Sequence, residues 1–311
     1  MWLRQVGVGP TDTLYRGHRA IFAWVWDLAL DRGRPILVLE PGEVVLDRAN
    51  VRRQAMLLVA CAVAKAKRGV VILPPRAVAR RAEVRPWGPT VALHRLSCLL
   101  ADVVLWRDQR SCTHLGIGDT TPDIGFAADL RDGLPWDERE ILMVTLRGKR
   151  SVPPKAWFEG IRAYCNENGL RIVTFAQVRG DEDRAKELAQ GLDAEHFLWT
   201  LDDLAHEELL RDLYGQARAV ISDRLHVLIL SSLSDTVPVE MVKNPAEKVR
   251  IHFGQIGVPA VSVDARGLSG ALVASALEDV IQAGPPSTAV KAAHESLAQW
   301  RDRVRALSLN L

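Results

Sequence analysis

An acid, a guanidinium and an imidazole stand close together within an otherwise apolar stretch of this sequence. The stretch, VISDRLHVLILSSLSDTVPVEM at residues 220–241, contains Asp223, Arg224 and His226. Arginine binds phosphate and carboxylate groups through a planar fork of donors, and histidine exchanges protons near neutral pH. One chemistry open to these side chains is therefore anion binding coupled to proton transfer. The equally weighted alternative is structural: Asp223 caps a helix, Arg224 forms a salt bridge and His226 is a hydrogen-bonded wall residue.

The flanking residues predict where this trio lies in a fold. Val220-Ile221 would end a strand, Ser222 or Asp223 would be the N-cap of the next helix, and the helix would begin near Arg224. Ligands of open parallel sheets bind beyond the carboxyl ends of the strands, where the following helices start. Unpaired backbone N–H groups and the helix dipole favour an anion at such a place. The trio is predicted to lie there.

Apolar strand-like runs alternate with longer helical patterns along the whole chain. Runs without polar alternation are typical of parallel sheets buried on both faces. The segments AMLLVACAVAKAKR and PKAWFEGIRAYCNENG have helical spacing, and the second ends with Asn168-Gly169, a helix stop signal. This alternation predicts a doubly wound α/β fold. The predicted strand cores are residues 36–39, 70–73, 103–105, 141–144, 172–175, 220–221 and 237–239.

The 311 residues are enough for two domains, each with its own core. RDGLPWDERE at residues 131–140 combines glycine, proline and dense charge, as linkers do. We predict an N-terminal Rossmann-like domain over residues 1–134 and a C-terminal one over residues 135–287, facing a central cleft. A closing amphipathic helix is predicted over residues 288–311.

The composition is that of a globular protein, with 48% hydrophobic residues, 25% charged residues and a net charge of +2. So small a basic excess argues against general nucleic-acid binding, and no stretch approaches the ~18 uninterrupted apolar residues of a membrane span. The N-terminus lacks the apolar core of a signal peptide. We therefore expect a cytoplasmic protein without a nucleic-acid partner. The cysteines also suit a reducing compartment such as the cytoplasm, because they lie in apolar neighbourhoods and lack metal-ligand or redox spacing. They are Cys61, Cys98, Cys112 and Cys165.

The opening stretch, followed by EKVR at residues 247–250, resembles the hallmark of the polysaccharide pyruvyl transferase family. That hallmark is a strand, an S-x-R-L-H turn, an apolar helix, a short strand and then a lysine. Further segments resemble family motifs in the expected order, and the resemblance runs from about residue 70 to residue 255. They are VVLWRDQRSCTHL with its R-D-x-x-S motif, TPDIGFAADL, ILMVTLRGKR, and TFAQVRGDEDRAKELA with its Q-V-x-x-D motif.

The resemblance implies a two-domain fold of the glycosyltransferase-B type. The implied activity is transfer of a pyruvyl group from phosphoenolpyruvate to two hydroxyls of one sugar, which forms a cyclic ketal and releases phosphate. The acceptor sugar would be part of a glycan or attached to a lipid-linked or nucleotide-linked carrier, and would bind on the side of the first domain. Phosphoenolpyruvate would bind on the side of the second. No metal or nucleotide cofactor is implied.

The resemblance also implies roles for single residues. His226 would be the acid–base catalyst, and Arg224 and Arg147 would bind phosphoenolpyruvate. Lys248 matches the family lysine and would bind phosphate or carboxylate as a point charge; Lys243 is its nearby competitor, and we favour Lys248. The alternatives are a surface ion pair for Arg147 and solvated loop charge for the lysines.

The first domain departs from the family pattern. VGVGPTDTLYRGHRAIF stands where family members have a G-N-x-G-D loop. Asp12 in this segment is a candidate for acceptor binding or for orienting His226, and a turn or N-cap role is the alternative. Arg107, Asp108 and Ser111 of the R-D-x-x-S motif are expected to be structural, as an N-cap with a buried ion pair.

Two other functions are compatible with the sequence. A nucleotide-sugar-dependent glycosyltransferase of the same fold would need a ribose-binding carboxylate and a diphosphate-binding loop in the second domain. FLWTLDDLAHEELL supplies acids, but on a helix-like polar stretch where solvated charge is usual. A catalytically inactive homologue could clamp a small anion, since the first-domain loops depart from the family pattern.

Overall fold

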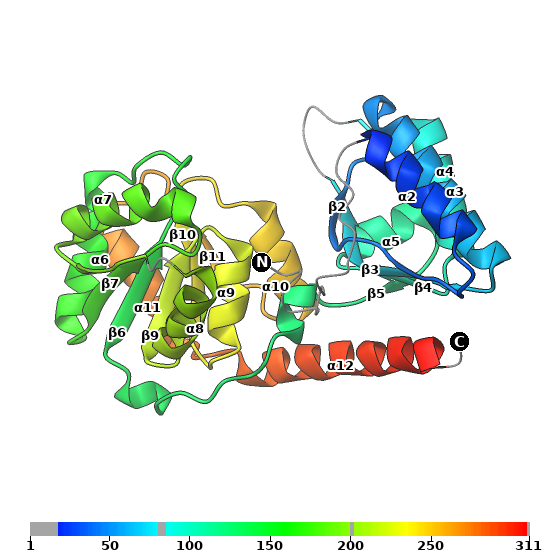
Figure 1. The fold of residues 1–311 in the computed structure, drawn as a ribbon. Coiled ribbons are helices and arrows are strands. Elements are labelled where there is room, and N and C mark those ends of the chain that lie inside the picture. Colours follow the sequence, from blue (N-terminus) through cyan, green and yellow to red (C-terminus); the bar gives the residue numbers. More distant parts are fainter. Residues whose placement is uncertain (1–17, 80–84, 200–201, 310–311) are drawn as a thin grey trace. The chain divides into compact units, whose positions relative to one another are not determined.

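The computed structural model describes residues 18–79, 85–199 and 202–309. Its contacts divide the chain into two compact units, which Figure 1 colours along the sequence. Unit 1 comprises residues 1–124 and 295–311, and unit 2 comprises residues 125–294. Each unit is built on a parallel sheet. The predicted α/β fold class is confirmed.

The sheet of unit 1 is organised around one long strand, β3 (Val70–Val78). Along one side, β1 (Ile36–Val38) pairs with the first half of β3 and β2 (Gly42–Val44) with the second half. On the other side lie β4 (Val103–Trp106) and then β5 (Asp119–Thr120). Two consecutive short strands, β1 and β2, thus pair with the same long strand, β3.

Both faces of this sheet are covered, as its unbroken apolar runs predict. Val71, Leu73 and Val104 face one core with the helices α2 (His18–Leu30), α3 (Val51–Ala66) and α4 (Gly88–Leu100). The alternate residues of β3 and β4 face Trp300, Val304 and Leu307 of α12 (Ser287–Leu309). Period-two alternation therefore divides each strand between two cores.

The R-D-x-x-S segment has the structural role predicted for it. Asp108 is the N-cap of α5 (Gln109–Leu115) and accepts a hydrogen bond from the backbone N–H of Ser111 at 2.7 Å. Arg107 forms a buried ion pair with Asp123, whose Oδ2 lies 2.8 Å from Nη1. Two family-like segments, the R-D motif and TPDIGFAADL, are joined by this pair.

Unit 2 contains a six-stranded sheet with the order β11-β10-β9-β6-β7-β8, and every neighbouring pair in it is parallel. The strand cores predicted in this half all lie within these strands. Their bounds are β6 (Ile141–Thr145), β7 (Arg171–Phe175), β8 (Glu195–Phe197), β9 (Ala217–Ser222), β10 (Val237–Val242) and β11 (Ser262–Asp264).

Helices cover both faces of the second sheet as well. Leu142 and Val144 face a core with α6, α7 and α11, whereas Ile141 and Met143 face α8 and α9. None of the described helices combines the length and apolar content that crossing a bilayer requires. The helix bounds are α6 (Lys155–Glu167), α7 (Glu182–Leu192), α8 (Asp203–Tyr214), α9 (Leu225–Ser232), α10 (Glu247–Gln255) and α11 (Gly270–Gln282).

The charged stretch predicted to link the domains packs closely on unit 2. Gly133 lies against Gly215, where an added Cβ would come within 2.3 Å of the Gly215 carbonyl oxygen. The division between the units falls after Ile124, upstream of the boundary predicted after residue 134. Arg139 accounts for much of this packing, because its buried guanidinium donates to the backbone oxygens of Leu134, Ala217, Ser234 and Asp235.

The cysteines behave as small hydrophobic residues. Cys61, Cys98 and Cys165 are buried, Cys112 is half-buried, and all four are free thiols. Burial raises the pKa of Cys98 to about 12, so this thiol stays protonated at neutral pH. The prediction that these residues pack rather than react agrees with this environment.

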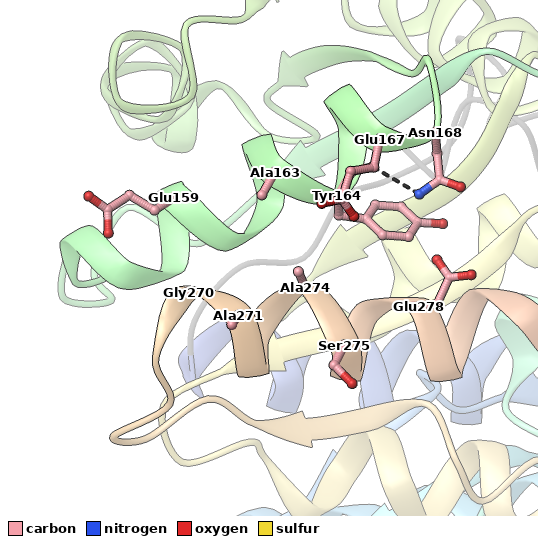
Figure 2. Close-up of a pocket in the computed structure, with 10 residues that line it drawn as sticks. All are labelled: Glu159, Ala163, Tyr164, Glu167, Asn168, Gly270, Ala271, Ala274, Ser275 and Glu278. Carbon is pink, nitrogen blue, oxygen red and sulfur yellow. Dashed lines mark hydrogen bonds between the residues drawn. The ribbon is translucent and has the colours of Figure 1, made fainter.

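Two helices on the surface of unit 2, α6 and α11, approach closely at glycine. An added Cβ at Gly160 would lie 2.4 Å from the carbonyl oxygen of Gly270. Beside this contact the helices diverge into a groove of about 690 Å³ in which the Tyr164 ring lies near Glu278 (Figure 2). Burial, then the charge of Glu278, raises the pKa of Tyr164 to about 12. The close approach requires glycine at position 160.

We expect the substitution Gly160→Ala to lower the free energy of unfolding by about 1–3 kcal/mol, since the methyl group would force the two helices apart. The matched control is Gly254→Ala in α10, where no atom lies within 4 Å of the new Cβ. That control should be neutral or stabilising by up to about 1 kcal/mol. Urea unfolding of both variants measures the difference, and equal effects would contradict the steric explanation.

A buried histidine in unit 1 is held in its neutral form. His94 is fully buried, and its Nδ1 lies 2.8 Å from Gln54 Oε1. Burial, assisted by the charge of Arg76, lowers the pKa of His94 to about 3. The unfolded chain binds a proton at this histidine below its ordinary pKa of about 6.5, whereas the folded chain does not. Protonation therefore favours unfolding.

Stability should consequently fall as the pH drops below about 6.5, by up to about 1.4 kcal/mol per pH unit from this residue. In the variant His94→Gln this contribution disappears, and the pH dependence between about 5 and 6.5 becomes flatter. The variant His114→Gln, which changes an exposed histidine, should retain the wild-type slope. Unfolding titrations at several pH values test the comparison.

Candidate functional site

The loops that follow β9, β6 and β7 lie side by side at one edge of the second sheet. These strands are neighbours in the order β9-β6-β7, and all three run in the same direction. Their carboxyl ends therefore meet at the same edge, where ligands of open α/β sheets bind. The loops contain the segments RGKR after β6, QVRGD after β7 and Asp223-Arg224 after β9.

Asp223 connects the loop after β9 with the loop after β6. It is buried, and its Oδ1 accepts a hydrogen bond from the backbone N–H of Arg147 at 2.9 Å. Its Oδ2 accepts one from Nε of Arg150 at 2.8 Å. Arg147 Nη2 in turn donates to the Asp223 carbonyl oxygen at 3.0 Å. A single carboxylate thus orders the main chain and two guanidinium groups.

The predicted N-cap of the following helix is wrong. Helix α9 begins at Leu225, and Arg224 occupies the N-cap position without a capping hydrogen bond from its side chain. Asp223 is not available for capping because its carboxylate binds the loop after β6. Ser222 Oγ instead accepts from the backbone N–H of Arg224 at 3.0 Å.

Asp181 connects the loop after β7 with the other two loops. Its Oδ2 forms an ion pair with the Nε and Nη2 atoms of Arg224. Its Oδ1 accepts a hydrogen bond from the backbone N–H of Gly148 at 2.9 Å. Asp181 is the aspartate of the Q-V-x-x-D segment and Arg224 the arginine of the S-x-R-L-H segment. The fold brings these two family-like segments into direct contact.

Two arginines that the sequence did not single out complete the network. Arg150 donates through Nη1 to the carbonyl oxygen of Lys243 at 2.8 Å, which ties the loop after β10 to the site. Arg184 of α7 donates through Nη2 to the carbonyl oxygen of Arg150 at 2.6 Å. The only sequence signal for Arg150 is the basic run RGKR directly after a buried strand.

The network has more cations than anions. Arg147, Arg150 and Arg224 surround the carboxylates of Asp181 and Asp223, so one positive charge is left uncompensated within this set. The Arg147 side chain is 44% exposed, and its Nε lies 3.7 Å from Asp223. Arg147 therefore has the most accessible guanidinium of the three and is the one best placed to reach a ligand. The arrangement favours a small anion.

His226 is the second residue of α9 and its side chain is exposed. It follows Arg224 by two positions, at the helix end where the backbone dipole is positive. An imidazole there can meet a molecule held by the neighbouring arginines and exchange a proton with it. His226 thus lies two positions after Arg224, which belongs to the arginine network.

The remaining predicted ligands occupy different settings. Lys243 directly follows β10, is exposed, and contributes its carbonyl oxygen to the network. Lys248 lies in the first turn of α10 and is half-buried. Asp12 lies outside the described residues. Within the described part of the chain, no three His, Cys, Asp or Glu side chains gather in a way that could hold a metal ion.

Comparison with known proteins identifies the family whose motifs contact one another in this structure. Residues 88–239 match the model of the polysaccharide pyruvyl transferase family. The resemblance to this family is therefore confirmed, and the match supports a transferase. It includes Arg107, Asp181, Asp223 and Arg224, the residues through which the family-like segments contact one another. No curated protein matches the sequence.

Solved structures similar to this chain share its fold. A Listeria monocytogenes protein provisionally named UDP-N-acetylglucosamine 2-epimerase aligns with a TM-score of 0.57 and 14% identity, over 98% of this chain and 86% of its own. Anabaena HepE in complex with UDP has a TM-score of 0.54 and 11% identity, over 94% and 82% of the two chains. S. aureus MnaA with UDP has a TM-score of 0.50 and 12% identity, over 93% and 83%. These likenesses confirm a fold of the glycosyltransferase-B type.

The network predicts different roles for the two arginines after β6. In Arg150→Met, buried Asp223 loses its closest side-chain donor, and we expect the free energy of unfolding to fall by about 2–3 kcal/mol. In Arg147→Met, the backbone N–H that binds Asp223 remains, and the change should stay within about 0.5 kcal/mol. Urea unfolding of both variants tests this, and equal losses would show that the structural assignment of Arg150 is wrong.

Proposed function

We propose that this protein is a ketal-forming pyruvyl transferase. It would move a pyruvyl group from phosphoenolpyruvate to two hydroxyls of a sugar residue of a glycan or glycoconjugate, with release of phosphate. The observation that carries the proposal is the contact between Arg224 and Asp181, which joins two segments of the matched family at the ligand-binding edge of the sheet. The proposed reaction is the one that the resemblance to the polysaccharide pyruvyl transferase family implies.

The donor is a dense anion with a phosphate and a carboxylate. In the proposal Arg147 and Arg224 bind these groups, because guanidinium forks match both in shape and charge. Arg224 is already oriented by Asp181, so part of the ordering cost of binding is met before the donor arrives. Lys248, with Lys243 as competitor, would add a point charge, and no metal or nucleotide cofactor is needed.

His226 is proposed to move the protons. The methylene carbon of phosphoenolpyruvate takes up a proton, which makes the adjacent carbon electrophilic, and a first sugar hydroxyl attacks that carbon as it loses its own proton. Phosphate then leaves with its bonding electron pair, and the second hydroxyl closes the ring and releases one further proton. An imidazole can donate and accept protons near neutral pH, so one residue can serve these steps in turn.

The test is transfer from phosphoenolpyruvate to a panel of glycans. We expect phosphate release and a product whose mass exceeds that of the acceptor by one pyruvic acid less one water. His226→Ala should retain affinity for phosphoenolpyruvate within about threefold and lose at least about a hundredfold in turnover. Arg147→Met should weaken donor binding by about tenfold. Calorimetric titration and mass spectrometry measure the two quantities separately.

The matched control is His114→Ala, which removes an exposed histidine of α5 in unit 1 and should change neither quantity. Transfer from a nucleotide sugar, with no response to phosphoenolpyruvate, would replace the proposal with a glycosyltransferase. Donor binding without turnover on any acceptor, equally in wild type and His226→Ala, would indicate an anion-binding homologue.

A further inference from the structure

Unit 1 contains a cavity that the proposed donor site does not use. Its volume is about 230 Å³, and it lies where the chain passes from β1 to β2, beside β3 and the first turns of α3. This volume is below the roughly 300–1,000 Å³ of pockets for drug-sized ligands, so the cavity suits one sugar residue. Its lining includes Trp24, Glu40, Glu43, Arg53, Gln54 and Arg76.

Arg76 is the unusual member of this lining. It is only 7% exposed, and its Nε and Nη1 atoms have no hydrogen-bond partner among the described residues. Burial lowers the pKa of Arg76 to about 10, so the group is still charged at neutral pH. Unit 1 also holds Arg107, which is equally buried but paired with Asp123. A buried cation whose donors are unmatched is costly unless a ligand supplies the anion.

The buried groups around Arg76 do not neutralise its positive charge, and Arg53 adds a second cation to the same cavity. His94 is nearby and neutral, because burial and Arg76 itself lower its pKa to about 3. The thiols of Cys61 and Cys98 are protonated, since burial raises their pKa values to about 11 and about 12. Glu40 is exposed and contributes a weaker electrostatic effect than burial does. None of the described residues that line the cavity is a buried carboxylate that could neutralise the guanidinium.

The other lining residues match the rest of a sugar. Glu40 and Glu43 are exposed carboxylates that can accept hydrogen bonds from sugar hydroxyls. Trp24 offers an indole ring, an apolar surface on which the C–H face of a sugar can pack. Arg53, in the first turn of α3, adds a second cation. Anion, hydroxyl and apolar contacts are thus available within one cavity.

We infer that this cavity binds an acidic sugar residue, with Arg76 taking its carboxylate or phosphate group and the glutamates its hydroxyls. The inference names a ligand class for unit 1, a glycan residue that carries an anionic group. That this residue belongs to the acceptor of the transferase rests on the proposed function. Binding itself does not, because every residue that carries the inference lies in unit 1.

The test uses D-glucuronate, glucose 1-phosphate and neutral glucose as probes, titrated against the full chain and followed by calorimetry or ligand-observed NMR. We expect saturable binding of at least one acidic probe and none of glucose. Binding of glucuronate alone identifies a carboxylate site, and binding of glucose 1-phosphate alone a phosphate site. In Arg76→Met the affinity for the acidic probe should fall at least about tenfold. Arg76→Lys keeps the positive charge but loses the forked guanidinium, so its affinity should lie between those of wild type and Arg76→Met.

The matched control is Arg110→Met, an exposed arginine of α5, which should bind within about twofold of wild type. Because Arg76→Met removes a buried charge with unmatched donors, its free energy of unfolding should equal or exceed that of wild type. A folded Arg76→Met variant with unchanged affinity, or no saturable binding of either acid, would overturn the inference.

The two proposals fail in distinguishable ways. Phosphoenolpyruvate affinity should be unchanged in Arg76→Met and reduced in Arg147→Met, whereas acidic-sugar affinity should show the opposite pattern. If acidic sugars bind through Arg76 and no pyruvyl transfer occurs, the cavity assignment stands and the proposed function falls. If transfer proceeds with neutral glycans and no acidic probe binds, the proposed function stands without the cavity.

Discussion

The architecture of the candidate site depends on two buried carboxylates at one edge of a parallel sheet. Asp181 and Asp223 each accept hydrogen bonds from the backbone of the loop after β6 and from arginine side chains. Three loops, which start from three neighbouring strands, are fixed to one another in this way. Backbone donors matter here, since a carboxylate bound to main-chain N–H groups fixes the path of the chain as well as the position of a cation.

A buried pair of a carboxylate and a guanidinium need not add to stability. Removing charges from water is costly, and a buried ion pair often contributes little net free energy compared with a hydrophobic contact. What the carboxylates of unit 2 provide is orientation: Arg224 is held against Asp181, while Arg147 keeps an exposed guanidinium. Groups fixed before the ligand arrives lose less conformational freedom on binding. The network is therefore suited to a small, highly charged ligand.

Unit 1 shows the same residue type in two contrasting settings. Arg107 is buried and paired with Asp123, and this pair joins two segments of the unit. Arg76 is buried to a similar degree, but two of its nitrogens lack partners among the described residues, and it lines a cavity. The proline pair that precedes Arg76 lies where the register between β3 and β4 shifts, because proline cannot donate to a strand ladder. The first arginine is structural, and the second has the character of a binding residue.

The sequence by itself determined seven strand cores, the parallel α/β class, the R-D-x-x-S cap and the presence of Arg147, Arg224 and His226 beyond strand ends. These are local properties, set by apolar runs, proline and glycine, and residue order. The short strands β2, β5, β8 and β11 were not predicted from the sequence. Only the tertiary structure decided what Asp223 and Asp181 bind, since their arginine partners lie 73 and 43 positions away in the chain. Strand order in the sheet, β9 beside β6 beside β7, makes those partners neighbours. That order arises from packing of both sheet faces against helices, which no short segment specifies.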